Sequence, residues 1–181
     1  MSCGNKDGDF KGNSCVCEVV RAIKDIQDNA EEVCECPSNC FLEPLGAISP
    51  SSTRRHKRPD TRVIVLKTAD GTPFHAFITN NNEHGKKGCV SIFFRVEDVF
   101  DNCCAILRVL EPIKVYGNTQ NQQDNQLLND QSVNLIKDCH IDLCSVCDVD
   151  FFRSTNDCIT VDLKCFCAVQ CIADVDLDIC S

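Results

Sequence analysis

Cysteine occupies 17 of the 181 positions of this chain, and many of the cysteines stand in close pairs. The pairs are Cys15/Cys17, Cys34/Cys36, Cys103/Cys104 and Cys165/Cys167. Dense cysteines are typical of small secreted domains whose cores are too small to hold a fold. A chain of this length can bury about 68–70% of its unfolded surface as one domain. Folding alone does not require so many bridges, and we expect some of them to join separate copies of the chain.

Composition and charge disfavour several classes of protein. A hydrophobic content of 43% and a charged content of 25% are ordinary for a globular protein. The formal net charge of −9 disfavours nucleic-acid binding, which needs a broad basic surface. The chain starts MSCGNKDGDFKGNSC, without the apolar segment of a signal peptide, and no stretch approaches the roughly 18 apolar residues of a membrane helix. We therefore expect no signal peptide, no membrane insertion and no nucleic-acid partner.

The hydrophobic pattern predicts an N-terminal helix followed by strands. Residues 1–13 are polar and glycine-rich and are predicted to be a flexible arm. Residues 14–33 are predicted to form a helix with Ser14 as its N-cap. Its apolar side chains recur at helical spacing on one stripe: Val16, Val19, Val20, Ile23, Ile26, Ala30 and Val33. We expect this stripe to pack onto a sheet formed by the rest of a single β domain, residues 14–181.

Strand patterns dominate the remainder of the chain. The predicted strands cover residues 62–67, 73–79, 89–97, 103–110, 112–116 and 158–171. Asp70-Gly71 predicts a hairpin turn after the first of them. Residues 117–138 are rich in Asn and Gln and are predicted to be a mobile surface insertion, while the basic run 54–58 is predicted to be a solvated loop or a contact with an acidic neighbour. The expected fold is mainly β, a single antiparallel β-sandwich or barrel-like domain with one N-terminal α-helix.

Strand geometry divides the cysteines by the direction in which they point. Neighbouring residues of a strand face opposite sides, so one of Cys103 and Cys104 should point outward. Cys158 should lie on the opposite face of its strand from Cys165, Cys167 and Cys171. The total is odd, so at least one thiol is free or bonded between chains. The candidates for intermolecular disulfides are Cys3, Cys15, Cys17, Cys103, Cys104 and Cys158. The candidates for intramolecular disulfides or buried thiols are Cys34, Cys36, Cys40, Cys139, Cys144, Cys147, Cys165, Cys167 and Cys171.

Two chemical alternatives compete with a structural role. A zinc-binding adaptor could use Cys139, His140, Cys144 and Cys147, although no second CxxC or His pair stands at finger or ribbon spacing. A thiol oxidoreductase could use Cys144 and Cys147, but the βαβ context of that class is missing. The sequence contains no Cys/His nucleophile signature, phosphate loop or serine nucleophile elbow. We therefore expect no catalytic residues and no cofactor.

Several segments carry a family likeness. They are the C-terminal run Cys165-Phe166-Cys167-Ala168-Val169-Gln170-Cys171, the opening Met1-Ser2-Cys3-Gly4, the helix start Cys15-Val16-Cys17, and the strands at 92–97 and 103–110. Together these segments closely resemble the CotY/CotZ/ExsY family of spore coat and exosporium proteins. The resemblance implies a structural protein made in the mother-cell cytoplasm without a signal peptide. It also implies self-assembly, with other coat or exosporium proteins as further partners, into a crystalline or disulfide-cross-linked layer around the spore.

Overall fold

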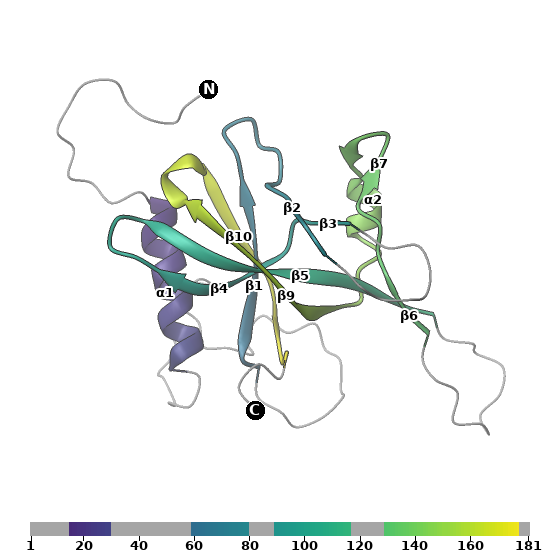
Figure 1. Cartoon of the computed structure of the whole chain (residues 1–181), viewed down its shortest axis with the longest axis horizontal. Coiled ribbons are helices and arrows are strands. Elements are labelled where there is room, and N and C mark those ends of the chain that lie inside the picture. The colour runs from purple at the N-terminus through teal and green to yellow at the C-terminus, as the bar shows by residue number, and fades with distance from the viewer. Residues whose placement is uncertain (1–14, 30–58, 80–88, 117–128, 178–181) are drawn as a thin grey trace.

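A computed structural model describes residues 15–29, 59–79, 89–116 and 129–177 of the chain (Figure 1). The described elements, in chain order, are α1 Cys15–Asp28, β1 Thr61–Lys67, β2 Ala76–Phe77, β3 Val90–Ser91, β4 Phe94–Val99, β5 Cys104–Tyr116, β6 Asn129–Ser132, β7 Ile136–Lys137, β8 His140–Ile141, α2 Leu143–Val146, β9 Phe151–Asp162, the 3₁₀ helix η1 Leu163–Cys165 and β10 Ala168–Val175. These elements confirm the predicted mainly antiparallel β fold with an N-terminal helix.

The long strand β5 organises the sheet. Along one side of β5 lies β9, while the other side pairs first with β4 and then with β6. Beyond β4 the order continues through β1 to β10, and every one of these pairings is antiparallel. Register shifts interrupt three of the pairings, at β1–β10, β4–β5 and β5–β9. Such irregularities increase strand twist, which agrees with the curled sheet of Figure 1.

One face of the sheet is covered by α1. The predicted apolar stripe is the buried face of this helix, where Val16, Val20 and Ile23 pack against the inward residues of β4 and β5. Phe94 and Leu107 are fully buried in the same cluster. Fully burying each such side chain stabilises the fold by about 1.5–3 kcal/mol, so packing onto the sheet, rather than helix propensity, holds α1 in place.

A second apolar cluster lies further along β5. Leu110 of β5, Phe93 and the side chains of Val133 and Leu135 form its buried centre. Residues 133 and 135 belong to the segment that the sequence predicted to be a mobile insertion. The expectation of a surface insertion up to residue 138 does not hold for residues 129–138, because Val133 and Leu135 are buried and Asn129–Ser132 pairs with β5 as β6.

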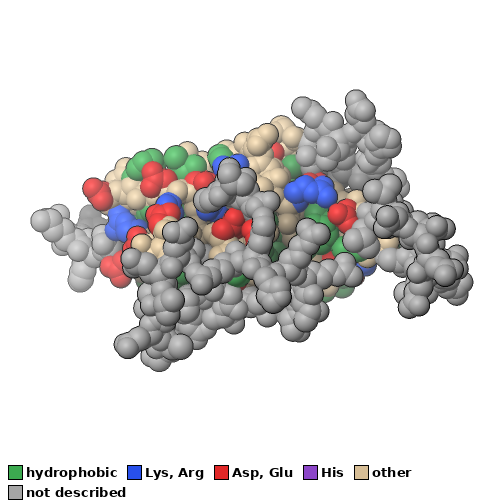
Figure 2. Space-filling model, turned by 90° about the horizontal axis from the view of Figure 1, so that it is seen from below, with side chains coloured by type: hydrophobic (Ala, Val, Ile, Leu, Met, Phe, Trp, Pro, Cys, Tyr) green, Lys and Arg blue, Asp and Glu red, His purple; other side chains and the backbone are tan. Residues whose placement is uncertain are grey.

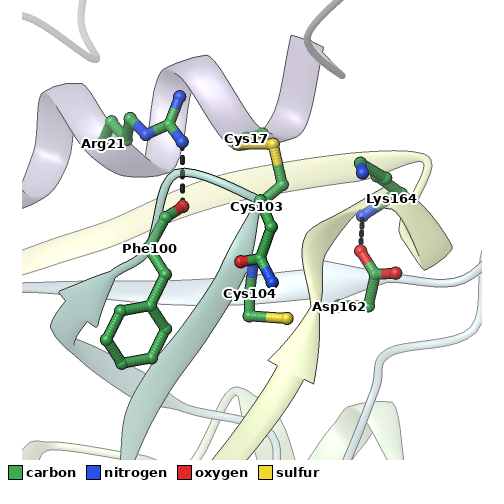
Figure 3. The surroundings of a disulfide bond; sticks show 8 residues. Cys17, Arg21, Phe100, Cys103, Cys104, Asp162 and Lys164 are labelled. Atoms are coloured by element: carbon green, nitrogen blue, oxygen red, sulfur yellow. Dashed lines mark hydrogen bonds between the residues drawn. A yellow bond between two sulfur atoms is a disulfide. The ribbon is translucent and has the colours of Figure 1, made fainter.

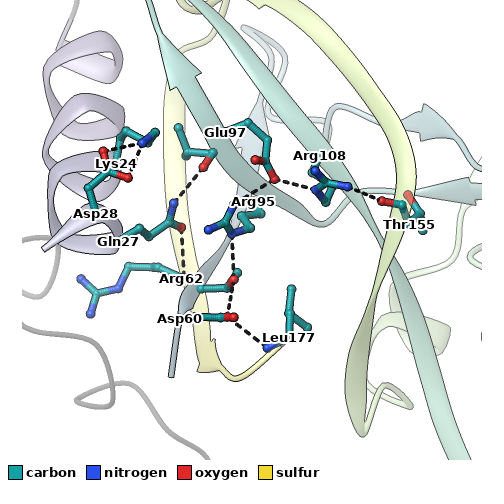
Figure 4. Close-up of polar contacts among 12 residues, drawn as sticks. Lys24, Gln27, Asp28, Asp60, Arg62, Arg95, Glu97, Arg108, Thr155 and Leu177 are labelled. Atoms are coloured by element: carbon teal, nitrogen blue, oxygen red, sulfur yellow. Dashed lines mark hydrogen bonds and ion pairs between the residues drawn. The ribbon is translucent and has the colours of Figure 1, made fainter. Parts of the chain in front are cut away.

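Polar side chains join α1 to the sheet at the C-terminal half of the helix (Figure 4). The Gln27 amide is buried, donates to the Val96 carbonyl oxygen at 2.8 Å and accepts from the Arg62 backbone N–H at 3.1 Å. The Arg62 guanidinium in turn makes a two-pronged ion pair with Asp174, at 2.8 and 2.9 Å, with both side chains fully buried. These contacts fix the helix against β1 and β4 and tie β1 to β10.

The predicted strand 158–171 is wrong as a single element. β9 ends at Asp162, η1 follows, and β10 begins at Ala168. The Asp162 side chain accepts a hydrogen bond from the Lys164 N–H at 2.9 Å and so caps η1. The resulting turn buries Leu163 and Phe166, which are three positions apart, and exposes Cys165. The break explains why alternation along the sequence assigns the sulfur atoms of Cys165 and Cys167 to the wrong side, whereas Cys171 packs against the core as predicted.

Several predictions fall outside the described residues. They concern the arm 1–13, the end of the predicted helix beyond residue 29, the basic run 54–58, and Cys3, Cys34, Cys36 and Cys40. Within the described ranges, no helix combines the length and the apolar character that a bilayer crossing needs.

Candidate functional site

A disulfide bond within the chain, called here the lock, joins α1 to the sheet (Figure 3). Cys17, in the first turn of α1, is disulfide-bonded to Cys103 in the β4–β5 turn, with their α-carbons 5.6 Å apart. Both residues are buried, and the Leu163 N–H donates to the Cys103 carbonyl oxygen at 2.9 Å. Arg21 adds a hydrogen bond from Nη2 to the Phe100 carbonyl oxygen at 2.8 Å. The start of α1, the β4–β5 turn and η1 therefore form one joined end of the molecule, which we call the helix pole.

The lock corrects two predictions. Cys17 and Cys103 were expected to reach other chains, but they bond to each other because the helix stripe places Cys17 against the turn that carries Cys103. A strand neighbour of Cys103 should point the other way, and Cys104 is indeed half-exposed with a free thiol. The predicted division of this pair into one inward and one outward cysteine is therefore confirmed, with Cys104 as the outward member.

Free thiols lie on the surface at several other places. Cys15 and Cys158 are exposed, as predicted for thiols that face outward. Cys89 is also exposed, although the sequence offered no pattern that assigned it a role. Cys167 is disulfide-bonded, in agreement with its predicted class, and Cys171 is half-buried.

Four predictions of buried or internally bonded cysteines are wrong. Cys165 is an exposed free thiol because η1 turns it away from the core. Cys139, Cys144 and Cys147 are exposed free thiols as well, because each lies on a short projecting element rather than on a strand of the sheet. The surface of the described part of the chain is therefore richer in thiols than strand parity alone predicts.

This projecting element, residues 136–149, is called here the thiol knob. It consists of β7, β8 and α2, and it lies at the opposite end of the molecule from α1 in Figure 1. The side chains of Ile141, Val146 and Val149 pack against the second apolar cluster. A hydrogen bond from the Asp142 N–H to the Leu135 carbonyl oxygen, at 2.9 Å, and an ion pair between Lys114 and Asp148, also at 2.9 Å, complete its attachment.

The knob places its thiols on two turns. Cys139 is at the tip of the β7–β8 hairpin, where Asp138 and Cys139 have φ angles of 51° and 64°. Cys144 and Cys147 lie on and just after α2, whose N-cap Asp142 accepts a hydrogen bond from the Cys144 N–H at 3.0 Å. Hydrogen bonds from the Ser145 hydroxyl and the Cys144 N–H hold the pKa of Asp142 below its ordinary value. Capping thus fixes the turn that presents the CxxC pair.

Charged groups surround the mid-sheet thiol Cys158. This residue lies directly opposite Arg108 in the β5–β9 register. The Arg108 guanidinium donates to Glu97 at 2.6 Å and to the Thr155 carbonyl oxygen at 2.8 Å (Figure 4). Burial raises the pKa of Glu97, but hydrogen bonds and charges from Arg108 and Arg95 outweigh it and leave that pKa below its ordinary value. Cys158 therefore lies beside a partly buried cluster of ion-paired side chains.

The zinc alternative gains no support from the described residues. Among the residues that the structure describes, no three His, Cys, Asp or Glu side chains converge in a way that could hold a metal ion. Cys139, His140, Cys144 and Cys147 therefore do not come together as the zinc site that their spacing suggested. In the face seen in Figure 2, Lys and Arg side chains alternate in small groups with Asp and Glu.

The fold and its sulfur chemistry define a class of protein. It is a cysteine-rich, mainly antiparallel β domain whose helix is locked by one internal disulfide and whose surface presents free thiols on both ends of the sheet.

Comparison with known proteins identifies the family. The family model described as "Spore coat protein Z" matches residues 1–174. The curated spore coat protein Z of Bacillus subtilis (strain 168) is 32% identical over 163 residues, which span 90% of each chain. No solved structure matches the chain significantly. The chain belongs to the spore coat protein Z family, which confirms the resemblance seen in its sequence.

Proposed function

We propose that this protein is a non-enzymatic structural component of the spore coat, where copies of it join one another and other coat proteins in a layer cross-linked by disulfides. Membership of the spore coat protein Z family supports the location. The observation that carries the cross-linking is the set of exposed free thiols on a domain whose helix is already locked. Those thiols add nothing to the packing of the described core, so their chemistry is available to neighbours.

The cross-linking reaction is ordinary thiol oxidation. Two thiols from two chains each lose a proton and an electron as the new sulfur–sulfur bond forms. An oxidised low-molecular-weight disulfide accepts both electrons and both protons and leaves as two thiols. The covalent bond turns a reversible contact into one that survives dilution and denaturants. A sheet-like array, with rotational symmetry between its copies, is the form we expect for such a layer.

The test is electron microscopy of the recombinant full-length protein, before and after heat and denaturant, with and without a reductant. We expect ordered arrays that withstand denaturant and fall apart when reduced. A soluble monomer after complete oxidation would refute the proposal.

Two single variants locate the contributing thiols. Cys104→Ser and Cys158→Ser should reduce covalent linkage, measured on non-reducing denaturing gels, while leaving monomer unfolding nearly unchanged, because neither thiol belongs to the buried core. Cys17→Ser is the contrasting variant, since its loss should weaken the fold first. Unchanged linkage in both Cys104→Ser and Cys158→Ser would exclude these two positions.

A further inference from the structure

Six of the free thiols in the described part of the chain lie in two groups, one at each end of β5. The helix pole presents Cys15, Cys104 and Cys165, and the thiol knob presents Cys139, Cys144 and Cys147. The strand β5 joins the two ends, because Cys104 begins it and Lys114, which pairs with Asp148 of the knob, lies ten residues further along. At the rise of an antiparallel strand this separation is about 30 Å.

Such a separation rules out bonds between the two groups within one chain, since bridged α-carbons lie about 4.4–6.8 Å apart. Within the knob, at most two of the three free thiols could pair with each other, and Cys144 and Cys147 on the α2 turn are the two nearest in sequence. Cys139 would then be left over, because the knob has three free thiols. At least one knob thiol therefore has no partner within the knob, and the helix pole of its own chain is out of its reach.

The backbone at Cys139 points to a role for its thiol. A two-residue hairpin turn with positive φ at both positions strongly favours glycine, yet here the second position is Cys139 with φ 64°. Residues other than glycine are strained at positive φ, and among them asparagine and aspartate tolerate it best. Residues held in such conformations cluster at functional sites. Cys103 has a similar φ of 67°, and the disulfide with Cys17 accounts for it. For Cys139 no such bond exists within the chain.

Charge argues against knob-to-knob contact. The knob and the residue after it contain four carboxylates, Asp138, Asp142, Asp148 and Asp150, against two cations, Lys137 within the knob and Lys114 of β5, which pairs with Asp148. Two knobs brought together would repel, and like charges across a contact disfavour it. The helix pole has mixed charge, with Arg21 and Lys164 among its carboxylates (Figure 3). Lys164 is next to Cys165 in the sequence, so this pole thiol has a cation as its neighbour.

We propose that the thiol knob of one copy bonds to the helix pole of the next. This inference rests on the proposed cross-linked layer and specifies how its copies join. One knob thiol and one pole thiol form the disulfide, and an oxidised low-molecular-weight disulfide takes up the two protons and two electrons and leaves as two thiols. The contact is head-to-tail, so each copy has an unused knob at one end and an unused pole at the other. Head-to-tail contacts build rings or open filaments, whereas a symmetric contact stops at a dimer.

The experiment is a complementation between two full-length variants, both in a Cys89→Ser/Cys158→Ser background that removes the other two exposed free thiols of the described residues. The knob variant lacks the three knob thiols through Cys139→Gly, Cys144→Ser and Cys147→Ser and keeps the pole thiols. The pole variant lacks the three pole thiols through Cys15→Ser, Cys104→Ser and Cys165→Ser and keeps the knob thiols. The variants carry tags of different size, are oxidised with oxidised glutathione, and are then separated on non-reducing denaturing gels. Retention of the Cys17–Cys103 bond, shown by mass spectrometry, and an unchanged melting curve report correct folding.

We expect the background protein to form a ladder of multimers. Each variant alone should remain a monomer, and an equal mixture should give the mixed dimer with no larger species. A dimer of the pole variant alone whose disulfide joins two knob cysteines in peptide mapping would mean knob-to-knob bonding. A dimer of the knob variant alone joined through two pole cysteines would mean pole-to-pole bonding, and either result overturns the inference. So does a background protein that stays monomeric while the wild type forms multimers. A wild type that forms no reductant-sensitive multimers would instead refute the proposed function.

A measurement on the unmodified protein covers the case in which a variant fails to fold. Peptides from oxidised wild-type multimers should include disulfides that join Cys139, Cys144 or Cys147 to Cys15, Cys104 or Cys165. Multimers without any such peptide would overturn the inference. The single variant Cys139→Gly adds a further check, because glycine relieves the positive φ. Its melting temperature should be equal to or above that of the wild type, whereas a structural role for this cysteine would lower it.

Discussion

Cys103 and Cys139 both occupy turn positions with a positive φ, but only Cys103 forms a disulfide within the described part of the chain. Each is in a tight turn between antiparallel strands, at a left-handed position where glycine is the usual residue. Cys103 is buried, bonded to Cys17 and covered by α1. Cys139 is exposed, with a free thiol at the tip of the knob. The two cysteines share a positive φ, so the neighbouring element decides whether such a cysteine holds the fold or remains available for bonding.

The difference extends to the surroundings of each turn. The β4–β5 turn is covered by a fourteen-residue helix that is held by a disulfide near its start and by Gln27 near its end. The knob rests on the second apolar cluster through a few side chains and an exposed ion pair. One end of the sheet is therefore fixed by several independent interactions, and the other projects with its thiols exposed. Four changes test this contrast, beginning with the largest expected effect.

The double variant Cys17→Ser/Cys103→Ser removes the lock. The bond closes a segment of 86 residues, and the loss of such a bond lowers the free energy of unfolding by about 2–5 kcal/mol. Chemical denaturation of the monomer measures this loss. The double variant Cys144→Ser/Cys147→Ser is the matched control and should unfold like the wild type. Equal effects of both pairs would abolish the distinction between the two ends.

Leu135→Ala tests how far the knob depends on the second apolar cluster. Leu135 is fully buried there, and truncation of such a leucine typically costs about 2–5 kcal/mol. The damage should concentrate at the knob, because the Leu135 carbonyl oxygen also accepts the hydrogen bond from Asp142. Hydrogen exchange resolved by residue should show faster exchange in 136–149 with little change in α1. Uniform acceleration across both regions would show that the two clusters unfold as one unit.

Gln27→Leu tests the second anchor of the helix. Its amide satisfies the buried Arg62 N–H and the Val96 carbonyl oxygen, and leaving such groups unpaired costs about 1–3 kcal/mol. The exposed Asp25→Leu variant on the same helix is the control for the added hydrophobic surface. Denaturation should separate the two variants, with Gln27→Leu the less stable. A loss no greater than that of the control would mean that water replaces the amide.

The sequence allowed a good prediction of the locked end and a poor one of the knob. The helical stripe of Val16, Val20 and Ile23 faces one side of a sheet, so periodicity located its core-facing residues. The pairing of Cys17 with Cys103 lay beyond prediction, because nothing local relates two positions 86 residues apart. In the knob, the sequence patterns that indicate structure extend over only one or two residues. Asp142 is an N-cap and Asp138-Cys139 forms a turn, but both follow an Asn/Gln-rich run that obscured the buried Val133 and Leu135.

The smallest expected effect is the acid response of the knob through Asp142. The folded-state pKa of Asp142 is below its unfolded value of 3.8, so its stabilising effect is complete above that value and is lost as the pH falls through the folded pKa. The Cys144 N–H, which donates to this carboxylate, should report the change as a shift of its NMR signal below about pH 4, while signals from the β4–β5 turn stay constant. Asp142→Asn keeps a capping side chain without a titrating proton and should remove the pH dependence, whereas Asp142→Ala should displace the signal at every pH. An acid shift that persists in Asp142→Asn would assign it to another group and would mean that the CxxC turn is held by contacts other than its cap.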